Sequence, residues 1–163
     1  MDLGRYSLEE LFLSAIKSEV DSRDLYKMMS SQTSNGLLKD KLGFLAKEEE
    51  KHRLILEDMY RKKVSKEKVV LPEETPVPLP KVEVREDTPM SVVFKQAMEA
   101  EKAAYDFYNS LADRVKDDGS MFNTLRYFAR MEMEHYRILE IEKEGAERFE
   151  EADVYWPMVH VGP

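Results

Sequence analysis

Apolar side chains recur at alternating spacings of four and three residues in four separate segments of the chain. This spacing places them on one face of an α-helix, and such a face is typical of a helix in a bundle. The pattern predicts helices over about residues 7–30, 37–63, 89–115 and 120–145. We therefore expect an all-α protein with four helices and a single domain over residues 1–163.

Short sequence signals mark the ends of these helices. Ser7-x-x-Glu10 has the form of a capping box at the start of the first helix. Thr88 followed by Pro89 is typical of a cap residue and a first-turn proline, and it predicts the start of the third helix. Residues 34–36 and 117–120 are rich in Ser, Asn, Asp and Gly and predict tight turns.

The segment from about residue 64 to 88 breaks the helical pattern. Its prolines exclude a continuous helix and favour an extended chain, which could span roughly 70 Å. A helix of 20 residues is only about 30 Å long, so the segment is long enough to cross over the whole length of a bundle. The alternative is a disordered linker between separate helical hairpins. In the tail, residues 146–163, we expect Tyr155, Trp156 and Met158 to pack on the bundle or on a partner chain.

Polar residues interrupt the apolar faces of the second and fourth helices. Glu49 and His52 occupy adjacent positions of the second face, and Glu132 and His135 occupy the matching positions of the fourth. Side chains three residues apart lie on one helical face, within reach of one metal ion. The neighbouring Glu48 is a register alternative, but Met131 stands at its matching position. Glu48 and Glu50 are expected in solvent.

The first and third helices each carry one glutamate in the middle of an otherwise apolar face. These are Glu19 and Glu101, which lie 82 residues apart, whereas Glu49 and Glu132 lie 83 residues apart. The chain is therefore an internal duplication, with a short turn within each half and one long connection between the halves. Two helical hairpins joined in this way predict a ferritin-like four-helix bundle.

Together the four faces supply four carboxylates and two imidazoles. Oxygen and imidazole ligands without thiolate suit iron or manganese, and zinc is a further candidate. Four carboxylates balance two divalent ions, and uncompensated buried charge would be costly. The alternatives are a buried ion-pair partner for each glutamate and a hydrogen-bonded core imidazole for each histidine. His160 lies outside both repeats and is not expected to be a ligand.

Further seam positions hold tyrosines and small residues near the lone glutamates. Tyr26 and Tyr108 lie two turns beyond those glutamates and are candidates to donate a hydrogen bond to a ligand carboxylate. The other reading is that they are ordinary core tyrosines. The small side chains are expected to leave room for a metal cluster and for dioxygen or peroxide; they are Ala15, Ser22, Ala97 and Ala104.

Composition excludes several other classes of protein. The chain has no cysteine, so thiol catalysis, disulfides and iron–sulfur clusters are ruled out. A formal charge of -8 argues against nucleic acid and anionic membranes as partners. No apolar run approaches the roughly 20 residues of a membrane span, and the first residues do not have the pattern of a signal peptide. We expect a cytoplasmic protein.

The repeated Glu-x-x-His motifs and the matched lone glutamates resemble the ferritin-like di-iron carboxylate superfamily, and the sequence around them is most similar to rubrerythrins. The resemblance implies two iron ions, bridged by oxide or hydroxide when oxidised, and reaction with peroxide or dioxygen in defence against oxidative stress. It implies that two of the glutamates bridge and that each Glu-x-x-His motif serves one ion. The implied ligands are Glu19, Glu49, His52, Glu101, Glu132 and His135.

The chain departs from rubrerythrins at two points. Rubrerythrins carry a cysteine-ligated rubredoxin domain that supplies electrons, so this chain would need an external electron donor. They also carry a further glutamate one turn after the lone glutamate of the third helix, where this chain has Ala104. Glu99 points about 160° away on an ideal helix and is a poor substitute.

Two other functions follow from the same residues. One is a ferroxidase subunit of an iron-storage cage, although the chain has no long fifth helix. The other is a metal-binding bundle that performs no redox chemistry. A monomer and a homodimer are both compatible with the sequence.

Overall fold

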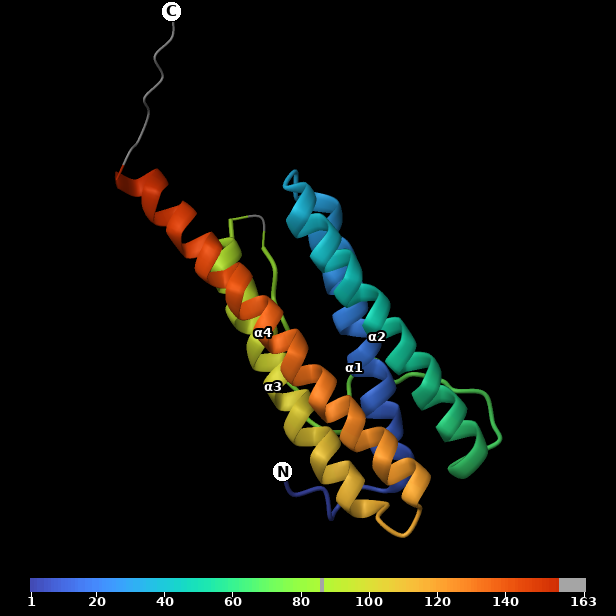
Figure 1. Ribbon diagram of the computed structural model, residues 1–163. Coiled ribbons are helices and arrows are strands. Elements are labelled where there is room, and N and C mark those ends of the chain that lie inside the picture. Colours follow the sequence, from blue (N-terminus) through green and yellow to red (C-terminus); the bar gives the residue numbers. More distant parts are fainter. Residues whose placement is uncertain (86, 156–163) are drawn as a thin grey trace, which may run out of the picture.

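The computed structural model describes residues 1–85 and 87–155; for residues 152–155 it describes the backbone alone. These residues form the helices α1 (Leu8–Gln32), α2 (Gly36–Lys63), α3 (Met90–Arg114) and α4 (Gly119–Tyr155). Figure 1 shows that α1 and α2 form one antiparallel hairpin, and α3 and α4 form a second one beside it. The predicted all-α, four-helix architecture is confirmed. Trp156, Met158 and His160 lie outside the described residues.

Three helix starts are capped by side chains from the preceding turn. In α1 the predicted capping box is present, because Ser7 N donates to Glu10 Oε2 at 2.8 Å and Glu10 N donates to Ser7 Oγ at 3.2 Å. Leu38 N donates to Asn35 Oδ1 at the start of α2. Near the start of α4, Met121 N donates to Asp118 Oδ1 at 3.1 Å. Each bond satisfies a backbone donor that has no partner within its own helix.

The start of α3 differs from the prediction. Pro89 itself is the N-cap residue, and Thr88 instead accepts a hydrogen bond from Arg85 N at 3.0 Å. A carboxylate from α4 takes the place of a local cap, since Ser91 N donates to Glu150 Oε1 at 3.0 Å. This contact depends on α4 continuing past the predicted end at residue 145; the helix in fact extends to Tyr155. The extension is rich in alanine and glutamate, which favour helix.

The apolar core consists of two clusters. The first includes Phe12, Leu56, Leu111 and Phe128 and is also contacted by partly buried residues of the crossover. The second surrounds Leu45 and lies toward the other end of the bundle. All six buried glutamate and histidine ligand candidates fall between these clusters along the helices, and His52 also contacts Phe128 of the first cluster.

The proline-rich crossover between α2 and α3 packs along the bundle. Val77 is buried in the first core cluster, and its backbone N donates to Ser14 Oγ of α1 at 3.2 Å. Farther along, Val82 packs against the second cluster, and Glu83 N donates to Gln96 of α3. The crossover therefore connects the two ends of the bundle (Figure 1), as its length allows. Within residues 1–85 and 87–155, none of the helices combines the length and apolar character needed to cross a bilayer.

Candidate metal centre

The structure brings all six candidate ligands into one buried layer. One glutamate comes from α1 and one from α3, while α2 and α4 each contribute a glutamate and a histidine one turn apart. Their exposed fractions are 3% or less; the residues are Glu19, Glu49, His52, Glu101, Glu132 and His135. Side chains of this kind are almost never fully buried unless they are paired or bind a metal.

The six side chains form two groups of four. One group contains Glu19 and His52, and the other contains Glu101 and His135; Glu49 and Glu132 belong to both. Within each group the potential ligand atoms lie within 4.8 Å of one another. The groups thus describe two neighbouring candidate metal positions that share two carboxylates.

The two shared carboxylates each present one oxygen to each imidazole. Glu49 places Oε2 at 3.5 Å from His52 Nδ1 and Oε1 at 3.0 Å from His135 Nδ1. Glu132 places Oε1 at 3.2 Å from His52 Nδ1 and Oε2 at 3.4 Å from His135 Nδ1. Two ligand atoms that are each about 2.0–2.2 Å from one ion can be at most about 4.4 Å apart. These separations therefore suit carboxylates that bridge two ions.

The unshared glutamates complete the two positions. Glu19 Oε2 lies 3.5 Å from His52 Nδ1, and Glu101 Oε2 lies 3.9 Å from His135 Nδ1. Each position therefore has three carboxylates and one imidazole around it. The two positions are related by the internal duplication of the chain.

Several of these buried polar atoms have no hydrogen-bond partner among the described residues. They include both carboxylate oxygens of Glu49, Oε1 of Glu132, and the Nδ1 atoms of His52 and His135. A buried polar atom without a partner costs about 1–3 kcal/mol. These atoms converge in two groups with metal-ligand chemistry, so the residues fit a pair of metal ions.

The electrostatics of the layer indicate that it needs added positive charge. Burial, reinforced by the neighbouring carboxylates, raises the pKa of Glu19 and Glu101 well above the ordinary value. Burial alone would also raise the pKa of Glu132, but the imidazoles of His135 and His52 lower it. Conversely, burial disfavours a charged His135, yet Glu132 and Glu49 raise its pKa to about 12. Without metal, the layer therefore holds protons in place of cations.

The two candidate tyrosines bond crosswise between the halves of the chain. Tyr26 of α1 donates its hydroxyl to Glu101 Oε1 of α3, and Tyr108 of α3 donates to Glu19 Oε1 of α1. Figure 1 shows why this is possible, because α1 and α3 run in opposite directions. Burial, followed by the nearby carboxylate, raises the pKa of both tyrosines, so both remain donors. Both tyrosines thus bond to carboxylates that are candidate ligands.

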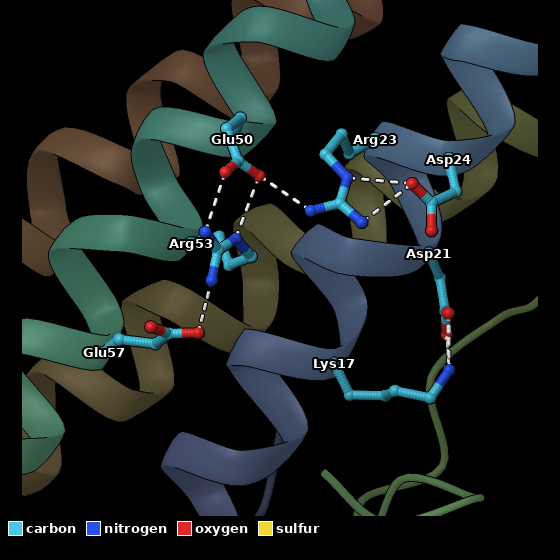
Figure 2. Close-up of polar contacts among 7 residues, drawn as sticks. All are labelled: Lys17, Asp21, Arg23, Asp24, Glu50, Arg53 and Glu57. Carbon is cyan, nitrogen blue, oxygen red and sulfur yellow. Dashed lines mark hydrogen bonds and ion pairs between the residues drawn. The ribbon is translucent and has the colours of Figure 1, made fainter. Parts of the chain in front are cut away.

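An ion-pair network that the sequence did not reveal braces α1 against α2 beside the ligand layer (Figure 2). Arg23 Nη1 of α1 donates to Glu50 Oε2 of α2 at 2.7 Å, and Arg53 binds both oxygens of Glu50 at 2.7 and 2.9 Å. Arg53 also bonds to Glu57. Glu50 is thus half-buried rather than solvated, and Glu48, paired with Lys51, is only 13% exposed. Sequence spacing within one helix could not show a contact between two helices.

Other predicted features also have defined places. The His52 ring lies 4.4 Å from the Phe128 ring, centroid to centroid, although the sequence identified Phe128 only as a core residue. Ala15 and Ala97 are fully buried, while Ser22 and Ala104 are partly exposed. Glu99 is exposed and outside both groups of ligand candidates, as its angle on the helix predicted.

A four-helix bundle with a buried layer of shared carboxylates and imidazoles defines the ferritin-like class of metal-carboxylate proteins. The family model for rubrerythrin matches residues 10–143, and the chain belongs to this family. The chain is also similar to a solved structure, described as a hypothetical protein from Pyrococcus furiosus, with 32% sequence identity and a TM-score of 0.78. That match covers 91% of this chain and 95% of the other. Among curated proteins, the search found no match.

Proposed function

We propose that the protein is a cytoplasmic non-haem di-iron oxidoreductase that reacts with peroxide or dioxygen in defence against oxidative stress. The observation that carries this proposal is the pair of carboxylates, Glu49 and Glu132, each of which faces both imidazoles. Membership of the rubrerythrin family favours iron as the metal. Two adjacent iron ions would supply two electrons to an oxidant, one from each ion.

The chain itself would hold and shield these ions. The six ligands bring four negative charges, which balance two divalent cations in a layer that water barely reaches. Tyr26 and Tyr108 orient the terminal carboxylates through their hydroxyl groups, because each bonds to one oxygen and leaves the other free to face a metal. The apolar clusters on both sides keep the carboxylates at fixed separations.

The electrons would come from a separate donor protein or small reductant. The chain has no cysteine and therefore cannot hold the thiolate-ligated iron that feeds electrons to the site in rubrerythrins. Ala104 stands where those proteins have a further glutamate, so this centre would operate with a symmetric set of six ligands.

The direct test is anaerobic reconstitution with Fe(II), followed by addition of peroxide or dioxygen. We expect two iron ions per chain and consumption of at least one oxidant faster than by the same amount of free iron. Glu134→Ala should react like the wild type, since Glu134 is an exposed residue on the same helix as Glu132. Consumption no faster than that of free iron would refute the proposed activity.

A bundle that binds metal without redox activity is the second candidate. Carboxylates and imidazoles suit manganese and zinc as well as iron, so the ligand set is equally compatible with a metal that does no redox chemistry. Elemental analysis of protein purified under reducing, anaerobic conditions would separate the two functions. Zinc at full occupancy, with no exchange for iron, would support the second candidate.

A further inference from the structure

A cavity of about 550 Å³ lies between α1, the crossover and α3, outside the ligand layer. Its volume falls within the range of about 300–1,000 Å³ that is typical of small-molecule sites. Most of its wall is apolar, and side chains from all three segments contribute to it. The residues that line it include Ser22, Leu25, Met28, Leu79, Val82 and Ala100.

Most of the charged side chains at this cavity have a close partner of opposite charge within the protein. Lys17 Nζ lies 2.6 Å from Asp21 Oδ2, and Asp24 accepts from Arg23 at 2.8 Å, as Figure 2 shows. On the crossover side, Lys81 Nζ lies 3.7 Å from an oxygen of Glu74. A charged ligand would lose hydration on entering a mostly apolar cavity in which most charges already have partners, so the cavity favours a neutral ligand.

Three hydroxyl groups give the cavity a limited polar character. Ser18, Ser22 and Thr75 line it. A hydroxyl can donate to a carbonyl or accept from an alcohol. Few polar groups on an apolar wall are typical of sites that orient a small organic molecule.

The cavity also lies beside the candidate metal centre along both helices. Ser22 follows Glu19 by one turn on α1, and Ala100 directly precedes Glu101 on α3. Both side chains are small, so a ligand can approach the two helix backbones closely. Substitution of either by a larger residue would reduce the volume directly.

We propose that this cavity binds a neutral, mostly apolar organic molecule that carries a carbonyl or hydroxyl group. The hydroxyls of Ser18, Ser22 and Thr75 contact its polar group, and the side chains of Leu25 and Leu79 contact its apolar part. This binding goes beyond the proposed reaction with peroxide or dioxygen and does not depend on which metal the centre holds.

The test uses the full chain, as purified, and the fluorescent probe prodan, a neutral naphthyl ketone. We expect saturable binding of one prodan per chain with a blue-shifted emission, confirmed by isothermal titration calorimetry. Anilinonaphthalene sulfonate, an anionic probe of similar size, should bind at least about tenfold more weakly, equivalent to about 1.4 kcal/mol. Absence of saturable prodan binding, or equal binding of the sulfonate, would overturn the proposal.

Variants locate the probe. Ser22→Phe and Ala100→Leu fill the cavity from opposite helices, and each should weaken prodan binding at least about tenfold. Gln32→Phe is the control, because Gln32 lines only a neighbouring cavity near Met90. Circular dichroism checks the fold of each variant. Full prodan affinity in both Ser22→Phe and Ala100→Leu, or loss only in Gln32→Phe, would place the probe elsewhere and refute the assignment.

Discussion

The shared position of Glu49 leads to a quantitative prediction about metal binding. Glu49 faces both imidazoles, whereas Glu19 belongs to only one group of ligands. Replacing Glu49 by Ala should therefore damage both metal positions. Replacing Glu19 by Ala should damage one and leave the position around His135 with all four of its ligands.

The size of the effect follows from linkage between binding and folding. At a free metal concentration one hundred times the dissociation constant, each occupied site stabilises the folded chain by about 2.7 kcal/mol. Two sites contribute about 5 kcal/mol, which corresponds to a rise in melting temperature of roughly 10–20 °C for a chain of this size. Glu19→Ala should keep about half of this rise, and Glu49→Ala should lose most of it.

The assay compares each variant with and without Mn²⁺, using scanning calorimetry and elemental analysis. The metal-induced shift is the relevant quantity, because removing a buried carboxylate also alters the metal-free protein. Glu48→Ala is the matched control, since Glu48 pairs with Lys51 and belongs to neither group of ligand candidates. Two ions per chain retained in Glu49→Ala, or equal losses in Glu49→Ala and Glu19→Ala, would refute the assignment of shared carboxylates.

Three further predictions concern protons, tyrosine and the ion-pair network. Burial raises the pKa of Glu19 and Glu101. Burial disfavours a charged His135, but the neighbouring carboxylates raise its pKa to about 12. Divalent metal should therefore displace protons at neutral pH and bind more weakly as pH falls. Calorimetry in two buffers of different ionisation enthalpy measures this release, and its absence would contradict the charge balance. Tyr108→Phe leaves a buried carboxylate oxygen without its donor and should lower the unfolding free energy by about 1–3 kcal/mol in urea titrations of metal-free protein; an unchanged value would contradict the crosswise bond. Arg53, followed by Arg23, lowers the pKa of Glu50 to about 2 despite partial burial. The stabilisation is therefore present above the ordinary pKa of 4.5 and is lost as pH falls toward 2. The stability difference between wild type and Glu50→Gln should be below about 1 kcal/mol at neutral pH and should shrink in acid; a constant difference would count against the ion pairs.

Most of the helical architecture could be predicted from the sequence. Helix positions repeat locally every 3.6 residues, so the apolar faces of α1 to α4 could be identified one helix at a time. The signals for the starts of α1 and α2 are also local, because the side chains of Ser7 and Asn35 accept hydrogen bonds from backbone N–H groups only three residues away. The cap of α3 by Glu150 was missed, because that contact joins residues 59 positions apart. The extension of α4 was also missed, although its residues favour helix locally.

The sequence also indicated which side chains share the candidate site. A glutamate or histidine in the middle of an apolar face needs a hydrogen-bond partner, an opposite charge or a metal ion in the core. The duplication places such residues at matching positions in both halves of the chain. Their function as metal ligands remains a proposal. The sequence suggested Tyr26 and Tyr108 as donors but could not show which glutamate each one bonds. Each bonds to the glutamate of the other helix, because the glutamate two turns away on its own helix is too distant.

The sequence by itself thus determined the helices, the duplication and the six buried polar positions, since each depends on periodicity within a single helix or on comparison of the two halves. Only the tertiary structure decided that Glu49 and Glu132 are the shared carboxylates, that Glu50 links α1 to α2, and that a mostly apolar cavity lies between α1, the crossover and α3. These features depend on the rotation and axial offset of one helix against another. Such quantities are set by long-range packing of the two hairpins and the crossover.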